Sequence, residues 1–148
     1  MDFVNKIVTV VLTFIMLVIA PITWEYVRSE MITERLVLNE MVQFLDRVTD
    51  KGTITAEDLD DLYLGVNSTG GTYDVEVKRY VRMSTLDEFG NPRTIYLSVP
   101  YEGETMNLGD IVKVTVDDVG RSPAKRLLWT LLRVDAGESR FSLSAMVR

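Results

Sequence analysis

The chain has 148 residues, a formal net charge of −6, and neither cysteine nor histidine. The acidic balance argues against nucleic acid or anionic lipid as a partner, because either would require a basic surface. Without cysteine or histidine there is no disulfide, no thiolate or common zinc site, and no Ser-His-Asp or Cys-His catalytic set.

Residues 3–24 are almost entirely apolar. The uninterrupted part, residues 7–20, is shorter than the roughly 20 residues that span a bilayer, but its flanks bring it to spanning length. Trp24 and Tyr26 stand where interfacial aromatic residues usually lie. The sequence therefore predicts a membrane anchor over residues 1–24.

A cleaved secretory signal peptide is the alternative, since such peptides have apolar cores of about 7 to 15 residues. The N-terminal region carries the acidic Asp2 as well as the basic Lys6, and residues 21–24 offer no cleavage site of the A-x-A type. Both observations favour a retained anchor. The positive charges on the two sides of the anchor are nearly equal in number. The short N-terminal tail therefore decides the expected orientation, with the N-terminus inside and the head outside.

An amphipathic stalk helix is predicted over residues 25–51. Alternating spacings of three and four residues place an apolar seam along one face, interrupted by a single charge, Glu34. The seam comprises Trp24, Val27, Met31, Glu34, Leu38, Met41, Leu45 and Val48. Further apolar residues widen it, so we expect the stalk to contact its own head and neighbouring chains, with Glu34 paired to a basic residue. Packing on its own head alone is the alternative.

Pro21 lies inside the helical pattern and removes one backbone donor. We expect the helix to kink or open near Leu17. The alternative is that Pro21 only marks the exit from the membrane.

The remaining residues, 52–148, predict a single α+β head. Gly52 suits the end of the long helix, and the capping-box-like Thr55 to Asp58 begins a short helix. The apolar positions of that helix, Leu59, Leu62, Tyr63 and Val66, share one face. The acidic run at 57–61 lacks the ligand spacing and central glycine of a calcium loop, which favours a solvated helix start.

Period-two alternation predicts four antiparallel strands after that helix, at about residues 73–83, 94–99, 111–116 and 141–147. Turn residues at 87–92 join the first two strands as a hairpin. Ser122 followed by Pro123 predicts a second short helix over 124–133. The expected head is an antiparallel sheet of about four strands with two short helices on one face.

This architecture resembles type IV pilins: a long N-terminal helix, apolar in its first half and carrying a proline about twenty residues in, followed by an antiparallel head. The segments VQFLDRVTDKGTITAEDLDDLYLGVNSTGGTYDVEV and LGDIVKVTVDD resemble small pilin-like proteins of tight-adherence-type pilus loci in Gram-positive bacteria. The chain departs from the pilin pattern at its start, where Met-Asp-Phe-Val-Asn-Lys replaces the family's Phe-rich opening and glutamate.

The resemblance implies a structural subunit that is stored in the membrane and then polymerises with copies of itself, through its N-terminal helix, into a helical cell-surface filament. A type IV-like pilus assembly machinery would be its partner. The expected membrane and filament core comprises Phe3, Ile7, Val11, Phe14, Val18, Pro21 and Trp24. In the family, a glutamate near the N-terminus pairs with the N-terminus of a neighbouring subunit during assembly, and the resemblance transfers this role to Asp2. Asp2 also stands one helical turn from Lys6 and can neutralise it.

Two other functions stay open at this point. One is a minor pilin or membrane-anchored component that primes assembly, and the other is a monomeric single-pass binding module. No enzyme activity and no cofactor are expected, because no pair of acidic residues stands out from ordinary helix and strand charges.

Overall fold

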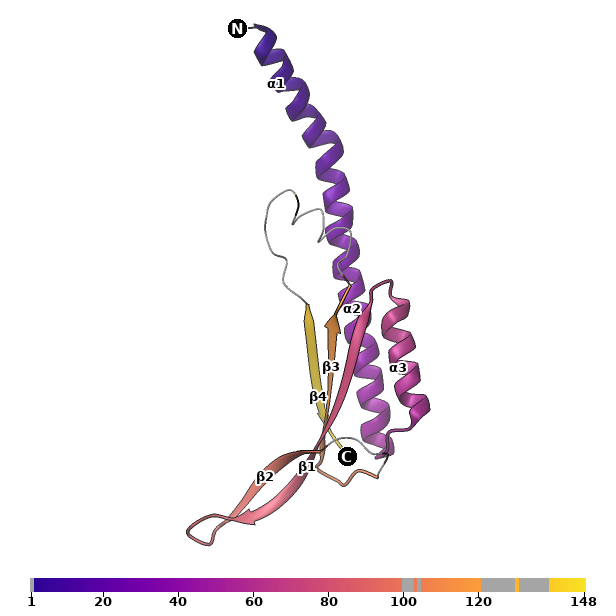
Figure 1. Ribbon diagram of the computed structural model, residues 1–148, viewed down its shortest axis with the longest axis vertical. Helices are drawn as coiled ribbons and strands as arrows, with labels where there is room; N and C mark the ends of the chain where they lie inside the picture. The colour runs from indigo at the N-terminus through magenta and orange to yellow at the C-terminus, as the bar shows by residue number, and fades with distance from the viewer. Residues whose placement is uncertain (1, 100–102, 104, 121–129, 131–138) are drawn as a thin grey trace.

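One continuous helix forms the long axis of the protein, and a small mixed head is built on its C-terminal half (Figure 1). The computed structural model describes residues 2–99, 103, 105–120, 130 and 139–148. The helix predicted over 124–133 lies outside the described residues, apart from Thr130. The elements are α1 (Asp2–Phe14), the π-helical turn η1 (Ile15–Ile19), α2 (Ala20–Lys51), α3 (Ala56–Ser68), β1 (Tyr73–Leu86), β2 (Pro92–Val99), β3 (Ile111–Asp118) and β4 (Arg140–Met146).

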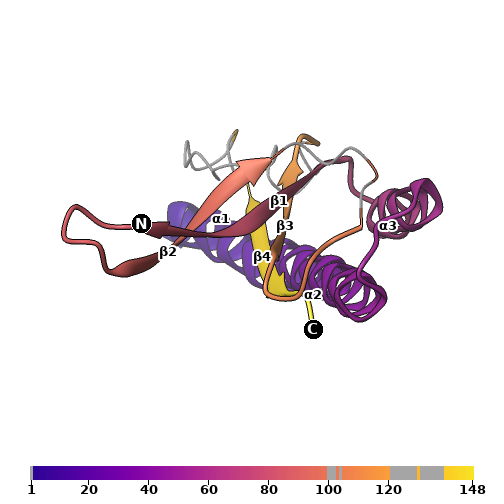
Figure 2. The same ribbon diagram turned by 90° about the horizontal axis from the view of Figure 1, so that it is seen from below.

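The four strands form one antiparallel sheet in the order β2-β1-β3-β4. β1 is the long strand and has a different partner along each half. Its first half pairs with β3, from Tyr73↔Asp118 to Tyr80↔Ile111, and its second half pairs with β2 up to Leu86↔Pro92. α2 and α3 lie on one side of the sheet (Figure 2). The predicted α+β class is confirmed.

The head's core lies between the sheet and the C-terminal half of α2. α2 packs against β3, β4 and α3, and α3 packs against β1. From α2 the core takes Val37, Met41, Phe44, Leu45 and Val48, all buried. The core therefore extends past the expected head boundary at residue 52 onto the long helix.

α3 begins as its sequence predicts. Thr55 is its N-cap and forms a reciprocal capping box with Asp58, and Gly52 ends α2 with a φ of 68°. Leu62 and Val66 are buried on the predicted face, but Tyr63 is 53% exposed, so its assignment to that face was wrong. The apolar face of α3 is narrow, because one side of the helix alone contacts α2 and the sheet.

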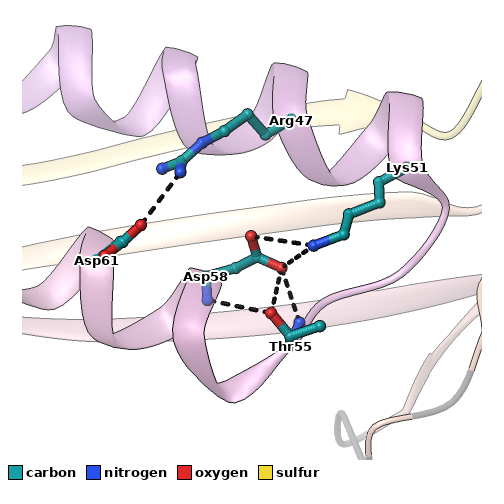
Figure 3. A network of polar contacts seen from close by, with 5 residues as sticks. All are labelled: Arg47, Lys51, Thr55, Asp58 and Asp61. Carbon is teal, nitrogen blue, oxygen red and sulfur yellow. Dashed lines mark hydrogen bonds and ion pairs between the residues drawn. The ribbon is translucent and has the colours of Figure 1, made fainter.

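The acidic start of α3 is tied to α2 by two ion pairs (Figure 3). Lys51 Nζ lies 3.1 Å from Asp58 Oδ2, and Arg47 lies 3.3 Å from Asp61. The Thr55 hydroxyl donates to the Asp58 carboxylate at 2.7 Å; this hydrogen bond, more than the charge of Lys51, holds the pKa of Asp58 below its usual value. The run at 57–61 thus caps α3 and joins it to α2.

A buried ion pair lies at the point where β1 leaves β3. Arg79 donates to Asp110 Oδ2 at 2.7 Å, and both side chains are almost fully buried. The backbone N–H groups of Arg82 and Asn107 donate to the same carboxylate, each at 3.0 Å. Burial by itself raises the pKa of Asp110, but these hydrogen bonds and the positive charge of Arg79 outweigh burial and lower it.

Removal of residues 1–24 should leave a folded, non-polymerising head, because the core begins at Val37. Removal of residues 1–51 should abolish folding. Each of the five buried α2 side chains contributes roughly 1.5–3 kcal/mol, and their sum is comparable with a domain's whole stability of about 5–15 kcal/mol. Circular dichroism and sedimentation measure both results; a cooperative melt of the shorter chain would show that the core closes without α2.

Asp110→Asn should destabilise the head by about 3 kcal/mol, because it leaves the Arg79 guanidinium buried without its counter-charge. In the wild type, the stabilisation that the ionised Asp110 provides is complete at neutral pH. It is lost as the pH falls below the ordinary carboxyl value of 3.8 towards the lower pKa of the folded state. Chemical denaturation from pH 7 to pH 3 should therefore show a shallower decline for the variant. Asp74→Asn, on the exposed face of β1, is the control and should match the wild type at every pH.

Candidate membrane and self-assembly surface

The N-terminal helix exposes apolar side chains on every side. Val4, Leu12, Met16 and Leu17 point in different directions around the helix, and each is more than half exposed. The predicted core residues are all exposed as well: Phe3, Ile7, Val11, Phe14, Val18, Pro21 and Trp24. A helix that is apolar all round is stable when lipid or other protein surrounds it.

The helix spanning Phe3–Lys51 is long and apolar enough to cross a membrane, and none of its apolar window is buried inside the chain. At 1.5 Å per residue its 49 residues extend about 74 Å. A bilayer core accounts for about 30 Å of that length. The helix is therefore long enough to cross a bilayer and still continue into the head.

The helix opens where the proline predicts. η1 is a π-helical turn, and it places the Ala20 N–H on the Ile15 carbonyl instead of on the carbonyl four residues back. Pro21 follows at once, without an N–H and with a ring that would clash with the Leu17 carbonyl in a regular helix. The wider turn relieves that clash. The local opening near Leu17 is therefore confirmed.

Hydroxyl groups within the apolar segment are satisfied inside the helix. Thr9 donates to the Asn5 carbonyl and Thr13 to the Thr9 carbonyl, each at 2.8 Å, and Thr23 donates to the Ile19 carbonyl. No hydroxyl of these three residues is left to be desolvated without a partner. These three hydroxyl groups therefore add little polar cost when the segment enters lipid or a bundle of helices.

The predicted stalk seam divides into two parts. Met41, Leu45 and Val48 are buried in the head and Leu38 packs against it. Above the head, Val27 is half-buried while Trp24 and Met31 are 67% and 50% exposed. One apolar pattern therefore serves the head's own core at its C-terminal end and faces outward at its N-terminal end.

Two charge contacts were predicted for assembly, and neither is seen among the described side chains. Glu34 is half-buried and makes no ion pair with any described residue. Lys6 lies on the exposed helix, and the side chain of Asp2 lies outside the description. The Glu34 contact and the Asp2–Lys6 pair both stay predictions.

Sequence reasoning missed the second apolar surface, on β1 and β2. β1 continues beyond the predicted end at Met83 to Leu86, and its hairpin with β2 extends past the head with Met83, Ile95 and Leu97 exposed. It also missed the Arg79–Asp110 pair at the base of that hairpin. The sequence did indicate this pair. Residue 79 lies on the same strand face as the core-facing Val75 and Val77, so a charge there required a buried partner.

The chain was compared with protein-family models, with curated proteins and with solved structures, and nothing matched in any of the three. The functional argument therefore depends on the surfaces themselves: an uncovered apolar helix, an outward seam above the head, and an exposed hairpin.

Proposed function

We propose that this chain is a structural, pilin-like subunit that is held in the cell membrane before assembly and polymerises through its N-terminal helix into a cell-surface filament. The observation that carries the proposal is the exposure of apolar side chains on all sides of residues 3–24. Exposing that surface to water costs about 25 cal/mol for each Å². The helix therefore needs lipid or protein around it both before and after assembly.

Two covers satisfy that requirement. Lipid can surround the segment while the subunit is stored, and neighbouring copies of the same segment can surround it in a bundle. The second cover places the heads around the outside of the bundle, because each head is built on the far half of the same helix. The turn at η1 lets the helix bend towards its neighbours.

In the orientation that we propose, the N-terminus is inside the cell and the head outside. The assembly machinery that would extract the subunit from the membrane is a type IV-like pilus system. In the packed bundle Lys6 would be a cation in a low-dielectric environment, and Asp2, of the same or a neighbouring chain, would neutralise it.

Phe14→Ala should reduce filament yield several-fold while membrane levels stay unchanged, because it removes packing volume from the bundle but keeps the segment apolar. The measurement is negative-stain microscopy and intact-chain mass spectrometry of sheared surface material from cells with the assembly machinery. Tyr63→Ala, on the exposed side of α3, is the matched control. Wild-type protein confined to membrane fractions, with no fibres, would contradict the filament and favour a minor subunit or a monomeric binding module.

Glu34→Leu should leave the head's melting temperature unchanged but change filament yield or stability. The residue is half-buried at the upper edge of the head, where a neighbouring subunit would supply its basic partner. Thermal melts of chains lacking residues 1–24 separate folding from assembly, and Glu57→Leu, exposed on α3, is the control. Unchanged yield and melting would mean that Glu34 faces solvent in the filament and that the seam is narrower than proposed.

A further inference from the structure

The outer face of the sheet, which is turned away from α2 and α3, differs in charge between its two ends (Figure 2). In the head the odd-numbered residues of β1, such as Val77, pack against the core, so its even-numbered residues and their strand partners lie on the outer face. Among the described strands, the end next to the β1–β2 hairpin has only basic charges, and the opposite end is mainly acidic. These charged residues are Lys78, Arg82 and Lys113 at the first end, and Asp74, Glu76, Asp117 and Arg140 at the second.

The bases at the hairpin end are not all neutralised within the chain. Lys78 Nζ lies 2.7 Å from Glu76 Oε1. The hydrogen bond from Lys78, and the positive charges around it, hold the pKa of Glu76 below its usual value. Arg82 and Lys113 make no ion pair with any residue that the structure describes. This end of the face therefore presents two cations to a neighbour.

α2 exposes a stripe on the side turned away from both the sheet and α3. Arg35, Asn39, Val42 and Asp46 follow one another at spacings of four, three and four residues, so they share one side of the helix. All four are exposed, and the buried core residues of α2 lie on the opposite side. We call these four residues the outer stripe. Its N-terminal end is basic and its C-terminal end is acidic.

Within one chain the two charge patterns run in opposite senses along the long axis. The Arg148 N–H donates to the Thr49 carbonyl just beyond β4, so the end of the sheet that pairs Ile111 with Met146 lies beside the C-terminal end of α2. The outer face is therefore basic at the height where the outer stripe is acidic. Towards the N-terminal end of α2 both signs are reversed.

The charges on the two surfaces are also separated by similar distances. Arg35 and Asp46 are eleven helical residues apart, about 17 Å. Lys113 and Asp117 are four residues of β3 apart, about 13 Å. Arg140, the base at the acidic end of the face, already lies 3.0 Å from Asp117. Two parallel copies at about the same height can therefore place Lys113 near Asp46 and Asp117 near Arg35 at the same time.

We propose that the outer face of the sheet packs on the outer stripe of α2 in a second, parallel copy of this chain. The proposal rests on the proposed function only for the choice of a second copy as the partner. Antiparallel copies would bring Lys113 towards Arg35 and Asp117 towards Asp46, so the charges select the parallel arrangement that a filament requires. α3 matches the face less well, because it carries acidic residues and no basic residue.

The contact orients the heads, while the anchors hold the copies together. It joins two different patches and is therefore heterologous, so it can repeat from copy to copy along a filament. A bundle of anchors keeps the heads at a high effective concentration, and a weak polar contact is then enough to set their orientation. Because the charges are exposed, salt screens them and weakens the contact.

Cysteine cross-linking between two tagged full-length chains tests the contact, because the chain contains no cysteine. One chain carries Ser142→Cys on the outer face and the other carries Val42→Cys on the outer stripe; each position lies between the two charged ends of its surface. The chains are mixed at low salt in detergent that covers residues 3–24 and are then oxidised. The expected mixed-tag dimer is several-fold more abundant than with Gln43→Cys, the neighbouring exposed residue, which points to another side of α2.

Charge reversal gives the second part of the test. Lys113→Glu in the Ser142→Cys chain, or Asp46→Lys in the Val42→Cys chain, should each lower the yield of mixed dimer several-fold, and the two together should restore it. A misfolded chain would not be rescued by a change in the other chain. Equal cross-linking from positions 42 and 43, no cross-link, or losses that the combined reversal does not restore would overturn the contact. Predominant Val42→Cys homodimers would also overturn it, because they would show that two stripes face each other.

Filaments are scored separately, by microscopy of the cysteine-free chain from cells with the assembly machinery. A cross-link that the combined reversal restores, without filaments, supports the contact and contradicts the proposed function. Filaments without the cross-link support the proposed function and overturn the contact.

Discussion

The structure depends on one constraint: both halves of a single helix carry apolar side chains, and different surroundings must bury them. Its C-terminal half has an apolar stripe that its own sheet and α3 bury. Its N-terminal half is apolar all round and contacts no described part of the head. The head has its own buried core, whereas exposing the anchor's apolar side chains to water is costly in free energy. The proposals of membrane residence and of assembly both rest on that difference.

The anchor meets the demands of lipid through its backbone as well as its side chains. In an apolar medium an unpaired backbone or hydroxyl group costs several kcal/mol, so breaks in the helix must be compensated locally. η1 shifts the hydrogen bond of the Ala20 N–H by one residue, which makes room for Pro21, and the threonine hydroxyls donate to carbonyls one turn back. The irregular turn is therefore compatible with membrane burial and gives the helix a place to bend.

Local patterns predicted the elements of the fold, while contacts between elements decided the rest. The glycine at 52, the Thr55 capping box, the four alternating strands and the opening at Pro21 are all properties of short segments, and all are present. Exposure of Tyr63 was missed because helical spacing gives the width of an apolar face but not how much of it a neighbour covers. The extent of β1 was missed because pairing with β2, beyond the reach of β3, sustains the strand to Leu86.

The same reasoning explains why the surfaces for assembly were only half visible in the sequence. Apolar residues 3–24 identify the anchor by composition alone. The exposed hairpin of β1 and β2 could not be found in that way, since Met83, Ile95 and Leu97 have the alternation of ordinary core positions. Their exposure arises because α2 ends before the sheet does. The carboxylate of Asp110 accepts hydrogen bonds from Arg79 and from the backbone N–H of Arg82, and so fixes the base of the hairpin where it leaves the helix. The sheet therefore continues past its helix with an apolar face uncovered, and a buried ion pair holds the base of that extension in place.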